Sequence, residues 1–296
     1  MKTGTVALVG LPNAGKSTLV NRLVGEKVAI VSDKPQTTRK RILGVARSPD
    51  AEIAFFDTPG IHRPEHRMNA AMVRDATDAL TTSDLVVWVL DAASPRGPGE
   101  ARLFDLLMRA QRPLFAALNK IDLVSKPRLL PRIADLSSRH AFQGIVPVSA
   151  KTGDGVELLA RLLSEALPEG APAYPRDFLT ATPATEWIGE VIREKLLERT
   201  RQELPFASAV VVDSVREEEE KGLTVVTASI IVEREGQKGI VVGKGGSMIR
   251  EIGSAARKEL AAESGRRYFL DLTVKVRERW RDDERFLSRV VGEPQS

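Results

Sequence analysis

A glycine-rich segment near the start of the chain, residues 10–18, constrains the fold more than any other stretch. Its sequence, GLPNAGKST, fits the pattern G-x-x-x-x-G-K-[ST], with Gly10, Gly15, Lys16 and Ser17 at the defined positions. The apolar run VALV before it predicts a buried strand, and apolar residues at helical spacing follow it. A turn between a strand end and a helix start directs backbone N–H groups and the positive end of the helix dipole toward phosphate. The segment therefore predicts a phosphate-binding loop.

The chain up to residue 167 alternates apolar runs with amphipathic segments. We predict strands at 42–46, 53–56, 85–90, 114–118 and 145–148, and helices at 69–81, 99–110 and 156–167. Near-continuous apolar strands that alternate with helices indicate an α/β fold with a mostly parallel sheet, covered on both faces. In such sheets ligands bind at the carboxyl ends of the strands, so polar motifs that directly follow strands are candidates for the site.

A proline-rich segment, residues 168–183, predicts a linker, because four prolines lie within sixteen residues. A chain of 296 residues is long enough for two domains that each bury a core. We predict a first domain at 1–167, a linker at 168–183, and a second domain with a C-terminal tail at 184–296. The second domain has the predicted element order α-β-β-α-α-β, which is an α+β fold.

The composition excludes several classes of protein. Without cysteine the chain has no disulfide, no cysteine-based zinc site and no thiol nucleophile. No apolar run reaches the roughly 18 residues of a membrane-spanning helix. The first predicted strand begins so close to Met1 that a signal peptide has no room, and we expect a cytoplasmic protein. The net charge of +4 is small, so the distribution of charge says more about partners than its total.

Three further polar motifs follow predicted strands: DTPG at 57–60, NKID at 119–122 and SAK at 149–151. The Asp122 carboxylate can accept hydrogen bonds from the N1–H and the exocyclic amine of guanine, whereas adenine would leave it unpaired. A helix N-cap is the alternative role for Asp122. The SAK backbone can contact the guanine oxygen, and the motifs together predict a guanine-nucleotide site. The predicted contacts are Gly10, Leu11, Pro12, Asn13, Ala14, Gly15, Lys16, Ser17, Thr18, Asp57, Thr58, Pro59, Gly60, Asn119, Lys120, Asp122, Ser149, Ala150 and Lys151.

A second glycine-rich segment, GKGG at 243–246, lies between two predicted helices and forms a G-x-x-G loop. The pattern alone usually indicates a flexible turn, but its apolar flanks and the element order resemble a type II KH domain. Such domains clamp about four nucleotides of single-stranded RNA. The stretch from Lys238 to Arg281 holds eleven Lys or Arg residues and five Asp or Glu, which favours phosphate contacts. A solvated basic helix face is the alternative. The predicted RNA contacts are Lys238, Val242, Gly243, Lys244, Gly245, Gly246, Ile249, Arg250 and Arg257.

An aromatic residue near the C-terminus, Trp280, leaves two interpretations open. It lies among arginines in the stretch 277–281. An indole between basic residues can stack on a base of single-stranded nucleic acid. It can equally pack into the core of the C-terminal segment.

The segments GLPNAGKST, PQTTR and DTPG together resemble the Era family among the translation-factor-related GTPases, and the resemblance extends from residue 5 to about residue 280. It implies that Lys16 holds β- and γ-phosphate oxygens and that Ser17 ligates Mg²⁺. It also implies that Asp57 reaches Mg²⁺ through a water and that the Gly60 amide meets the γ-phosphate. In the loop before the second strand we choose Thr38 as a further Mg²⁺ ligand.

The catalytic arrangement that the resemblance implies leaves three positions open. Thr37 is the competitor of Thr38 as a Mg²⁺ ligand. Many GTPases place a water-orienting glutamine after the DxxG motif, where this chain has Ile61, which forms no side-chain hydrogen bond. Asn13 matches a position that helps to hold K⁺ in related GTPases, and such an ion can replace an arginine finger. A turn-shaping role is the alternative for Asn13. The predicted catalytic residues are Asn13, Lys16, Thr38, Asp57 and Gly60, and the predicted metal ligands are Ser17, Thr38 and Asp57.

The whole resemblance implies a monomeric GTPase that uses GTP, GDP and Mg²⁺. It implies that the KH domain binds the 3′ region of small-subunit ribosomal RNA and that the protein assists assembly of the 30S subunit. GTP would order residues 33–39 and 57–67. One alternative is an RNA-modifying GTPase, which needs a further catalytic constellation that the sequence lacks. Another is a membrane-associated regulatory GTPase with a peripheral contact at the inner face of the membrane, for which residues 280–291 are a poor anchor.

Overall fold

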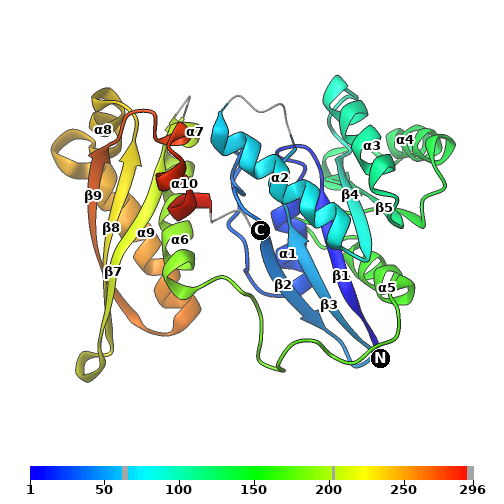
Figure 1. The fold of residues 1–296 in the computed structure, drawn as a ribbon, viewed down its shortest axis with the longest axis horizontal. Helices are drawn as coiled ribbons and strands as arrows, with labels where there is room; N and C mark the ends of the chain where they lie inside the picture. Colours follow the sequence, from blue (N-terminus) through cyan, green and yellow to red (C-terminus); the bar gives the residue numbers. More distant parts are fainter. Residues whose placement is uncertain (62–65, 202–203, 292–296) are drawn as a thin grey trace. The chain divides into compact units, whose positions relative to one another are not determined.

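The chain forms two compact units in a computed structural model that describes residues 1–61, 66–201 and 204–291 (Figure 1). Among these residues, the first unit contains 1–31, 38–61 and 69–181. The second contains 182–201 and 204–291, together with the short segments 32–37 and 66–68. The segment 168–181, which the sequence predicts to be linker, is thus grouped with the first unit.

The first unit is built on a six-stranded sheet with the order β2-β3-β1-β4-β5-β6. All neighbouring strands run parallel except β2, which is antiparallel to β3. The predicted α/β class with a mostly parallel sheet is therefore confirmed. The strands are β1 (Lys2–Val9), β2 (Ile42–Arg47), β3 (Ala51–Asp57), β4 (Leu85–Asp91), β5 (Leu114–Asn119) and β6 (Gly144–Pro147). The helices are α1 (Lys16–Val24), α2 (Arg67–Thr82), α3 (Pro98–Ala110), η1 (Ile121–Leu123), α4 (Lys126–Arg139) and α5 (Val156–Ala166).

Both faces of this sheet are buried. Successive residues of each strand point to opposite faces, so neighbouring residues belong to different hydrophobic clusters. In β1, Val6 and Leu8 belong to one hydrophobic cluster, and Ala7 and Val9 belong to the other. Helices α1 and α5 cover the first face, whereas α2, α3 and α4 cover the second. Burial on both faces is the reason why the strands are almost uninterrupted apolar runs.

The second unit has a three-stranded sheet in the order β7-β8-β9, with β7 antiparallel and β9 parallel to β8. Helices α6, α8 and α9 bury their apolar residues against one face of it. The predicted order α-β-β-α-α-β and the α+β class are both confirmed. The strands are β7 (Ala209–Glu218), β8 (Leu223–Val232) and β9 (Arg267–Val276). The helices are α6 (Ala184–Arg199), α7 (Leu204–Ala207), η2 (Glu219–Lys221), α8 (Glu235–Val242), η3 (Lys244–Gly246), α9 (Ser247–Ser264), η4 (Trp280–Asp282) and α10 (Glu284–Val291).

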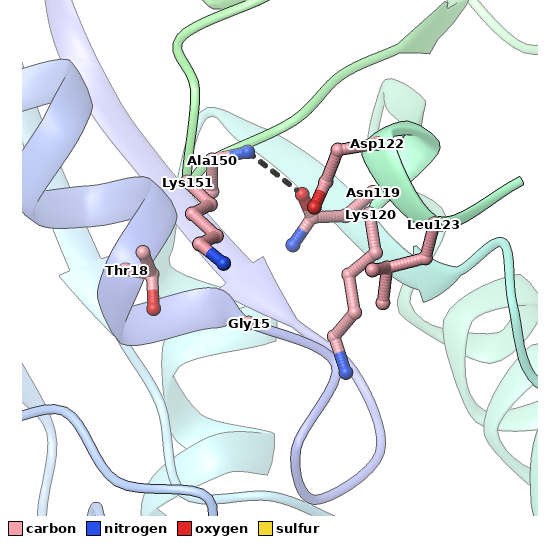
Figure 2. Close-up of a pocket in the computed structure, with 8 residues that line it drawn as sticks. All are labelled: Gly15, Thr18, Asn119, Lys120, Asp122, Leu123, Ala150 and Lys151. Atoms are coloured by element: carbon pink, nitrogen blue, oxygen red, sulfur yellow. Dashed lines mark hydrogen bonds between the residues drawn. The ribbon is translucent and has the colours of Figure 1, made fainter.

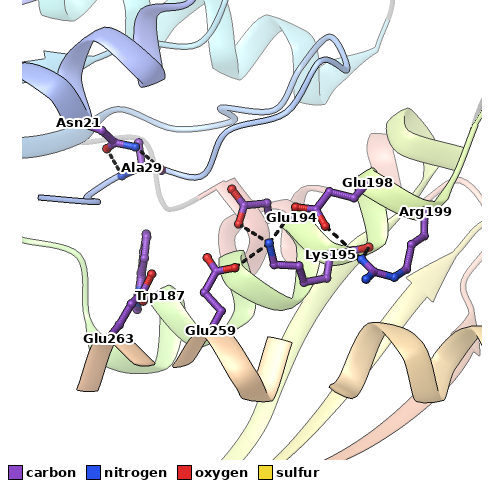
Figure 3. Close-up of polar contacts among 9 residues, drawn as sticks. All are labelled: Asn21, Ala29, Trp187, Glu194, Lys195, Glu198, Arg199, Glu259 and Glu263. Atoms are coloured by element: carbon purple, nitrogen blue, oxygen red, sulfur yellow. Dashed lines mark hydrogen bonds and ion pairs between the residues drawn. The ribbon is translucent and has the colours of Figure 1, made fainter. Parts of the chain in front are cut away.

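An ionic cluster joins α6 to α9 inside the second unit (Figure 3). The Lys195 ammonium lies 2.6 Å from a carboxylate oxygen of Glu259 on α9, and 2.7 and 3.1 Å from those of Glu198 and Glu194 on its own helix. Burial alone would lower the pKa of Lys195, but these carboxylates outweigh it and raise that pKa. The cluster therefore keeps a positive charge between the two helices.

The segment 168–181 lies along the edge of the first unit and is held there by side chains of β2 and β3. The Glu52 carboxylate accepts hydrogen bonds from the amides of Ala173 (2.7 Å) and Tyr174 (3.3 Å). The Arg47 guanidinium donates to the carbonyls of Pro175 and Phe178, each at 2.7 Å, and to Glu52 at 3.0 Å. Proline lacks an N–H but keeps its carbonyl, so a proline-rich segment can still be fastened by arginine donors.

Replacing Arg47 with alanine should release this segment from β2. Two backbone carbonyls lose their Arg47 donors and the Glu52 carboxylate loses one of its three, and each lost hydrogen bond costs about 1 kcal/mol. We expect faster amide hydrogen exchange in residues 173–180, with unchanged exchange in α1 and β1. Arg47→Lys is the matched control, because it keeps the charge beside Glu52 but cannot reach two carbonyls at once. Equal exchange in Arg47→Ala and the unmodified protein would contradict the role assigned to Arg47.

Candidate functional site

The three glycines of the phosphate loop and the DTPG motif lie where a Cβ atom would meet a close neighbour, which is backbone for Gly10 and Gly60 and a side chain for Gly15. A Cβ atom on Gly10 would lie 2.5 Å from the Val89 carbonyl oxygen. On Gly15, which has a φ of +91°, it would lie 2.3 Å from the side-chain nitrogen of Asn119. On Gly60 it would lie 2.8 Å from the backbone of Pro12. These positions therefore accept only glycine, and they bring the phosphate loop against two other motifs.

Lys16, the first residue of α1, is buried beneath the loop. Its ammonium donates hydrogen bonds to the carbonyls of Gly10 and Leu11, each at 3.2 Å. Burial lowers the pKa of Lys16 to about 8, and the nearby Asp57 carboxylate opposes this only in part. A buried ammonium with a lowered pKa lacks sufficient negative charge around it. An anionic ligand in the loop would supply that charge.

Binding of a phosphate-bearing ligand should therefore be coupled to protonation of Lys16. Phosphate raises the pKa of the ammonium, so above about pH 8 the bound state takes up a proton that the free state lacks. We expect affinity to fall as the pH rises past about 8, by up to tenfold per unit. Calorimetric titration with a nucleoside triphosphate in two buffers of different ionisation enthalpy, at about pH 7 and about pH 8.5, measures the uptake. The unphosphorylated nucleoside is the control, and buffer-independent heats at both pH values would contradict the coupling.

Three oxygen-bearing side chains from separate segments meet beside Lys16. The Ser17 hydroxyl donates to Asp57 Oδ2 at 2.6 Å and lies 2.8 Å from the Thr38 hydroxyl. Thr38 also donates to Asp57 Oδ2, at 3.2 Å. In contrast, the Thr37 hydroxyl donates to the Lys34 carbonyl at 2.6 Å, so Thr38 is the threonine of this cluster.

The cluster has the chemistry of a Mg²⁺ site. Asp57 is fully buried, its Oδ1 atom has no hydrogen-bond partner among the described residues, and burial raises the pKa of its carboxyl group. A buried carboxylate with an unused oxygen, next to two hydroxyls, supplies the hard oxygen ligands that Mg²⁺ prefers. No group of three or more His, Cys, Asp or Glu residues with metal-binding geometry occurs in the described part of the chain. The hydroxyl–carboxylate cluster is therefore the candidate metal site.

A pocket of about 170 Å³ lies next to the loop and is lined by the other polar motifs (Figure 2). Asp122 lies within η1, whose N-cap is Lys120, and the N-cap of α4 is Ser125. The structure thus does not give Asp122 the alternative role of a helix N-cap. Instead its Oδ1 accepts a hydrogen bond from the Ser149 hydroxyl at 2.7 Å, which orients the carboxylate. The lining residues are Gly15, Thr18, Asn119, Lys120, Asp122, Leu123, Ala150 and Lys151.

Asn119 joins the pocket to the phosphate loop. Its side-chain nitrogen donates to the Ala14 carbonyl at 2.8 Å, and its oxygen accepts from the Ala150 amide at 2.9 Å. The next residue, Lys120, has a φ of +65° and forms a 2.7 Å ion pair with Asp91. Asp91 was not predicted as a site residue. It pairs in register with Asn119 at the end of β4, and a polar residue directly after an apolar strand is the signal that could have found it.

The residues after Asp57 are hydrogen-bonded to β1 and to the first residue of the phosphate loop. The buried Thr58 hydroxyl donates to the Leu8 carbonyl at 2.7 Å, and the Ile61 amide donates to the Gly10 carbonyl at 3.3 Å. The Ile61 side chain packs against the hydrophobic cluster on the second face of the sheet. Residues 62–65, which belong to the segment 57–67 that GTP is predicted to order, lie outside the described part of the chain.

The G-x-x-G loop of the second unit connects α8 to α9. Gly243, Gly245 and Gly246 have φ angles of +73°, +59° and +77°. A Cβ on Gly243 would lie 2.8 Å from Met248, whereas nothing lies within 4 Å of one on Gly245 or Gly246. The Arg250 guanidinium donates to the Gly245 carbonyl at 2.8 Å and so braces the loop from α9. The open space at two of these glycines allows another chain to approach the backbone closely.

The surface around this loop is basic and partly apolar. Lys244, Arg250 and Arg257 are exposed, and Lys238 is half-buried. Two predicted contacts, Val242 and Ile249, are half-buried, and Ile249 packs against the core. The sequence reasoning missed Ile240, which is 53% exposed on α8. Helical spacing could have found it, because the buried residues of α8 lie on a different face.

Trp280 packs in the core of the second unit and does not present its ring to a ligand. It is fully buried, and its indole N–H donates to the Ala207 carbonyl at 3.0 Å. Its ring also contacts that of Phe286 on α10 edge to face. The stacking interpretation of Trp280 is therefore wrong, because the ring is buried and its N–H is hydrogen-bonded to the Ala207 carbonyl.

Comparison with protein families and known proteins matches both units. Residues 5–120 match the family described as 50S ribosome-binding GTPase, and residues 204–281 match the KH domain. The chain is 47% identical to GTPase Era of Geobacter metallireducens over 289 residues, which are 98% of this chain and 97% of the relative. It is 43% identical to GTPase Era of Heliobacterium modesticaldum over 281 residues, 95% and 94% of the two chains.

Solved structures with the same arrangement of elements are also related in sequence. A variant of Aquifex aeolicus Era bound to GDP·AlF4⁻ superimposes with a TM-score of 0.95 at 36% identity, covering 98% of this chain and 99% of that one. An Era complex with MgGDPNP and nucleotides 1506–1542 of 16S ribosomal RNA has a TM-score of 0.95 at 37% identity, covering 98% of both chains. Within the part of the chain that the structure describes, none of the helices has the length and hydropathy needed to cross a membrane.

Proposed function

The chain belongs to the Era family of GTPases, and from this premise we propose that it is an RNA-responsive switch in assembly of the small ribosomal subunit. In this proposal it binds and hydrolyses GTP, and its KH unit binds small-subunit ribosomal RNA near the 3′ end. The observation that carries the proposal is the single site in which Lys16, the Ser17–Thr38–Asp57 cluster and the Asp122 pocket adjoin the same loop. One guanine nucleotide with its Mg²⁺ would use all three.

In this proposal, different residues bind the phosphates, the base and the metal ion. Lys16 and the loop amides would hold the β- and γ-phosphates, and Asp122 and the SAK backbone would hold the guanine. Ser17, Thr38 and Asp57 would hold Mg²⁺, which neutralises phosphate charge when bound. Asp57 ends β3 and Thr38 lies in the loop shortly before β2, so two of the three proposed metal ligands lie at the same end of one antiparallel strand pair.

We propose that this strand pair carries the switch. The γ-phosphate would order residues 33–39 and 57–67, and hydrolysis would release them. The order of these segments would then change the affinity of the KH unit for RNA. Support comes from the bonds between Thr38 and the Ser17–Asp57 pair, which join both segments to the phosphate loop.

Hydrolysis needs an aid other than a glutamine, because the half-buried Ile61 side chain packs against the core cluster and can form no hydrogen bond to water. We propose that K⁺ bound with the help of Asn13 stabilises the transition-state charge. Asn13 is exposed and has a φ of +63°, a conformation that asparagine tolerates better than most residues. Asn13 therefore also suits the turn, and the dependence of GTP turnover on K⁺ separates the two roles.

Steady-state GTP turnover, measured with and without RNA in K⁺ or Na⁺ buffer, tests the proposal. The RNA carries the 3′ end of small-subunit ribosomal RNA, and a shuffled RNA of the same composition is its control. We expect the fastest turnover with the specific RNA in K⁺, and a loss of turnover in Lys16→Ala. Unchanged turnover in Lys16→Ala would remove the nucleotide site from the proposal. Equal turnover in K⁺ and Na⁺ would contradict the proposed role of K⁺. Equal turnover with the specific and the shuffled RNA would contradict the proposed response to RNA.

We also propose that the protein acts as a monomer in the cytoplasm, where its proposed ribosomal partner is found. A peripheral contact with the inner face of the membrane is the alternative. Sedimentation of the purified protein and fractionation of cells separate these cases. A dimer would overturn the monomer, and recovery with salt-washed membranes would favour the membrane contact over the cytoplasmic proposal.

A further inference from the structure

We propose that Arg22 on α1 is a positioning residue for guanine recognition. It would fix the peptide groups of the SAK segment that face the 6-oxo group of the base. The inference rests on the proposed guanine-nucleotide function, and it adds a residue that belongs to none of the sequence motifs. Loss of Arg22 would therefore change the selectivity of the site among nucleotide bases.

The guanidinium of Arg22 reaches two consecutive carbonyls of that segment. Its Nε donates to the Ala150 carbonyl at 3.3 Å, and its NH2 donates to the Lys151 carbonyl at 2.7 Å. A planar guanidinium with several fixed N–H donors suits two neighbouring acceptors, which a single ammonium would match less well. Two bonds from one rigid group restrict the rotation of both peptide planes.

The direction of the Lys151 amide follows from these bonds. The Ala150 carbonyl and the Lys151 N–H belong to one planar trans peptide group, in which the C=O and N–H point in opposite directions. Arg22 holds the carbonyl toward α1, so the N–H points the other way. Ala150 and Lys151 both line the pocket (Figure 2), and the Ala150 amide is already bonded to Asn119. The Lys151 amide is thus the donor that Arg22 would aim at the 6-oxo oxygen.

Helix α1 then links the two ends of the nucleotide site. It begins at Lys16 and Ser17, which serve the phosphates, and it carries Arg22 on a later turn. Rigid helix geometry fixes the spacing between these groups. The structure assigns the base-binding segment two tethers to the loop–helix unit, one through Asn119 to Ala14 and one through Arg22.

The neighbouring residue Asn21 provides a matched control on the same helix. Its side-chain oxygen accepts from the amides of Val28 and Ala29 at 3.0 and 2.9 Å, and its nitrogen donates to the Ala29 carbonyl at 2.7 Å (Figure 3). Asn21 therefore also braces a backbone segment, but that segment does not line the pocket. Asn21→Ala and Arg22→Ala remove comparable bonds at different places.

Displacement of a fluorescent GDP analogue by three diphosphates tests the inference. GDP carries both recognised groups, IDP lacks the 2-amino group that Asp122 would bind, and 6-thio-GDP replaces the 6-oxo oxygen with a larger, weaker acceptor. In Arg22→Ala we expect the preference for GDP over 6-thio-GDP to fall by about threefold to tenfold, the range expected for one hydrogen bond. The preference for GDP over IDP should stay within about twofold, because Asp122 keeps its Ser149 bond.

Two further variants and a competitor make the outcomes distinct. Arg22→Lys should restore part of the preference, since its ammonium offers a single donor nitrogen in place of the two that Arg22 uses, and Asn21→Ala should change neither ratio. Equal weakening of all three ligands in Arg22→Ala would show only a stabilising role and overturn the inference, as would no change. If the unmodified protein does not prefer GDP to ADP, the proposed guanine site itself fails. Thermal unfolding of each variant shows whether it folds, and Arg22→Lys replaces Arg22→Ala if the latter does not.

Discussion

Replacing Asp122 with asparagine should change the base preference of the protein from guanine to xanthine. In the proposed site the Asp122 carboxylate would accept two hydrogen bonds from guanine, whereas an asparagine side chain could accept only one and would present its amide to the 2-amino group. Two donors then face each other in a pocket, which costs far more than a missing bond. Xanthine has an oxygen at this position and accepts from the amide. We expect affinity for GDP to fall by at least about a hundredfold and affinity for XDP to rise.

Competition of GDP and XDP against a fluorescent nucleotide measures this change in base preference. Ser149→Ala is the matched control, because it removes only the hydroxyl that orients Asp122 at 2.7 Å and should weaken GDP without favouring XDP. Asp122→Ala should lose GDP affinity without gaining any for XDP. A variant Asp122→Asn that still prefers GDP would show that this carboxylate does not read the base.

Replacing Gly246 with aspartate should lower RNA affinity by roughly tenfold or more. A Cβ at this position meets nothing within 4 Å, so the new side chain fits, and Asp tolerates the φ of +77° better than most residues. The added carboxylate would face phosphates at the loop where Lys244 supplies positive charge. Gly243 is a poorer choice, because a Cβ there would lie 2.8 Å from Met248 and disturb the loop itself.

Two controls isolate the effect of charge at the loop. Gly246→Asn has nearly the same shape without the charge and should retain most of the affinity. Gly222→Asp adds the same charge at a residue with a φ of +55° and open space, in the turn between β7 and β8. Affinity is measured by fluorescence anisotropy at two salt concentrations. Equal affinities of Gly246→Asp and Gly222→Asp would show that the G-x-x-G loop does not bind RNA.

The strand–loop–helix units were predictable because their signals are local. The apolar run before residue 10 and the helical spacing after Lys16 correspond to β1 and α1. The required glycines mark close approaches that no larger residue permits, so their spacing can be read directly in the sequence. The positions of the polar motifs at strand ends follow from the parallel sheet, since such ends meet at one edge.

The state of residues 168–181 was not predictable from composition. The four prolines of residues 168–183 indicate a linker, yet residues 168–181 are fastened to β2 and β3 by Arg47 and Glu52, which are more than a hundred residues away in sequence. The role of Trp280 was likewise not predictable from the sequence, because a tryptophan among arginines suits both a ligand-binding surface and a core. Such choices depend on which acceptor lies nearby in three dimensions.

The sequence by itself determined the positions of the two glycine-rich loops and the order of the elements, because glycine spacing, apolar periodicity and polar motifs after strands are properties of short segments. The tertiary structure decided which of several candidate residues contribute to the site. It placed Thr38, and not Thr37, beside Ser17 and Asp57, and it brought Arg22 to the carbonyls of the SAK segment. Hydrogen bonds act over about 3 Å, and only the folded chain sets which distant groups come that close.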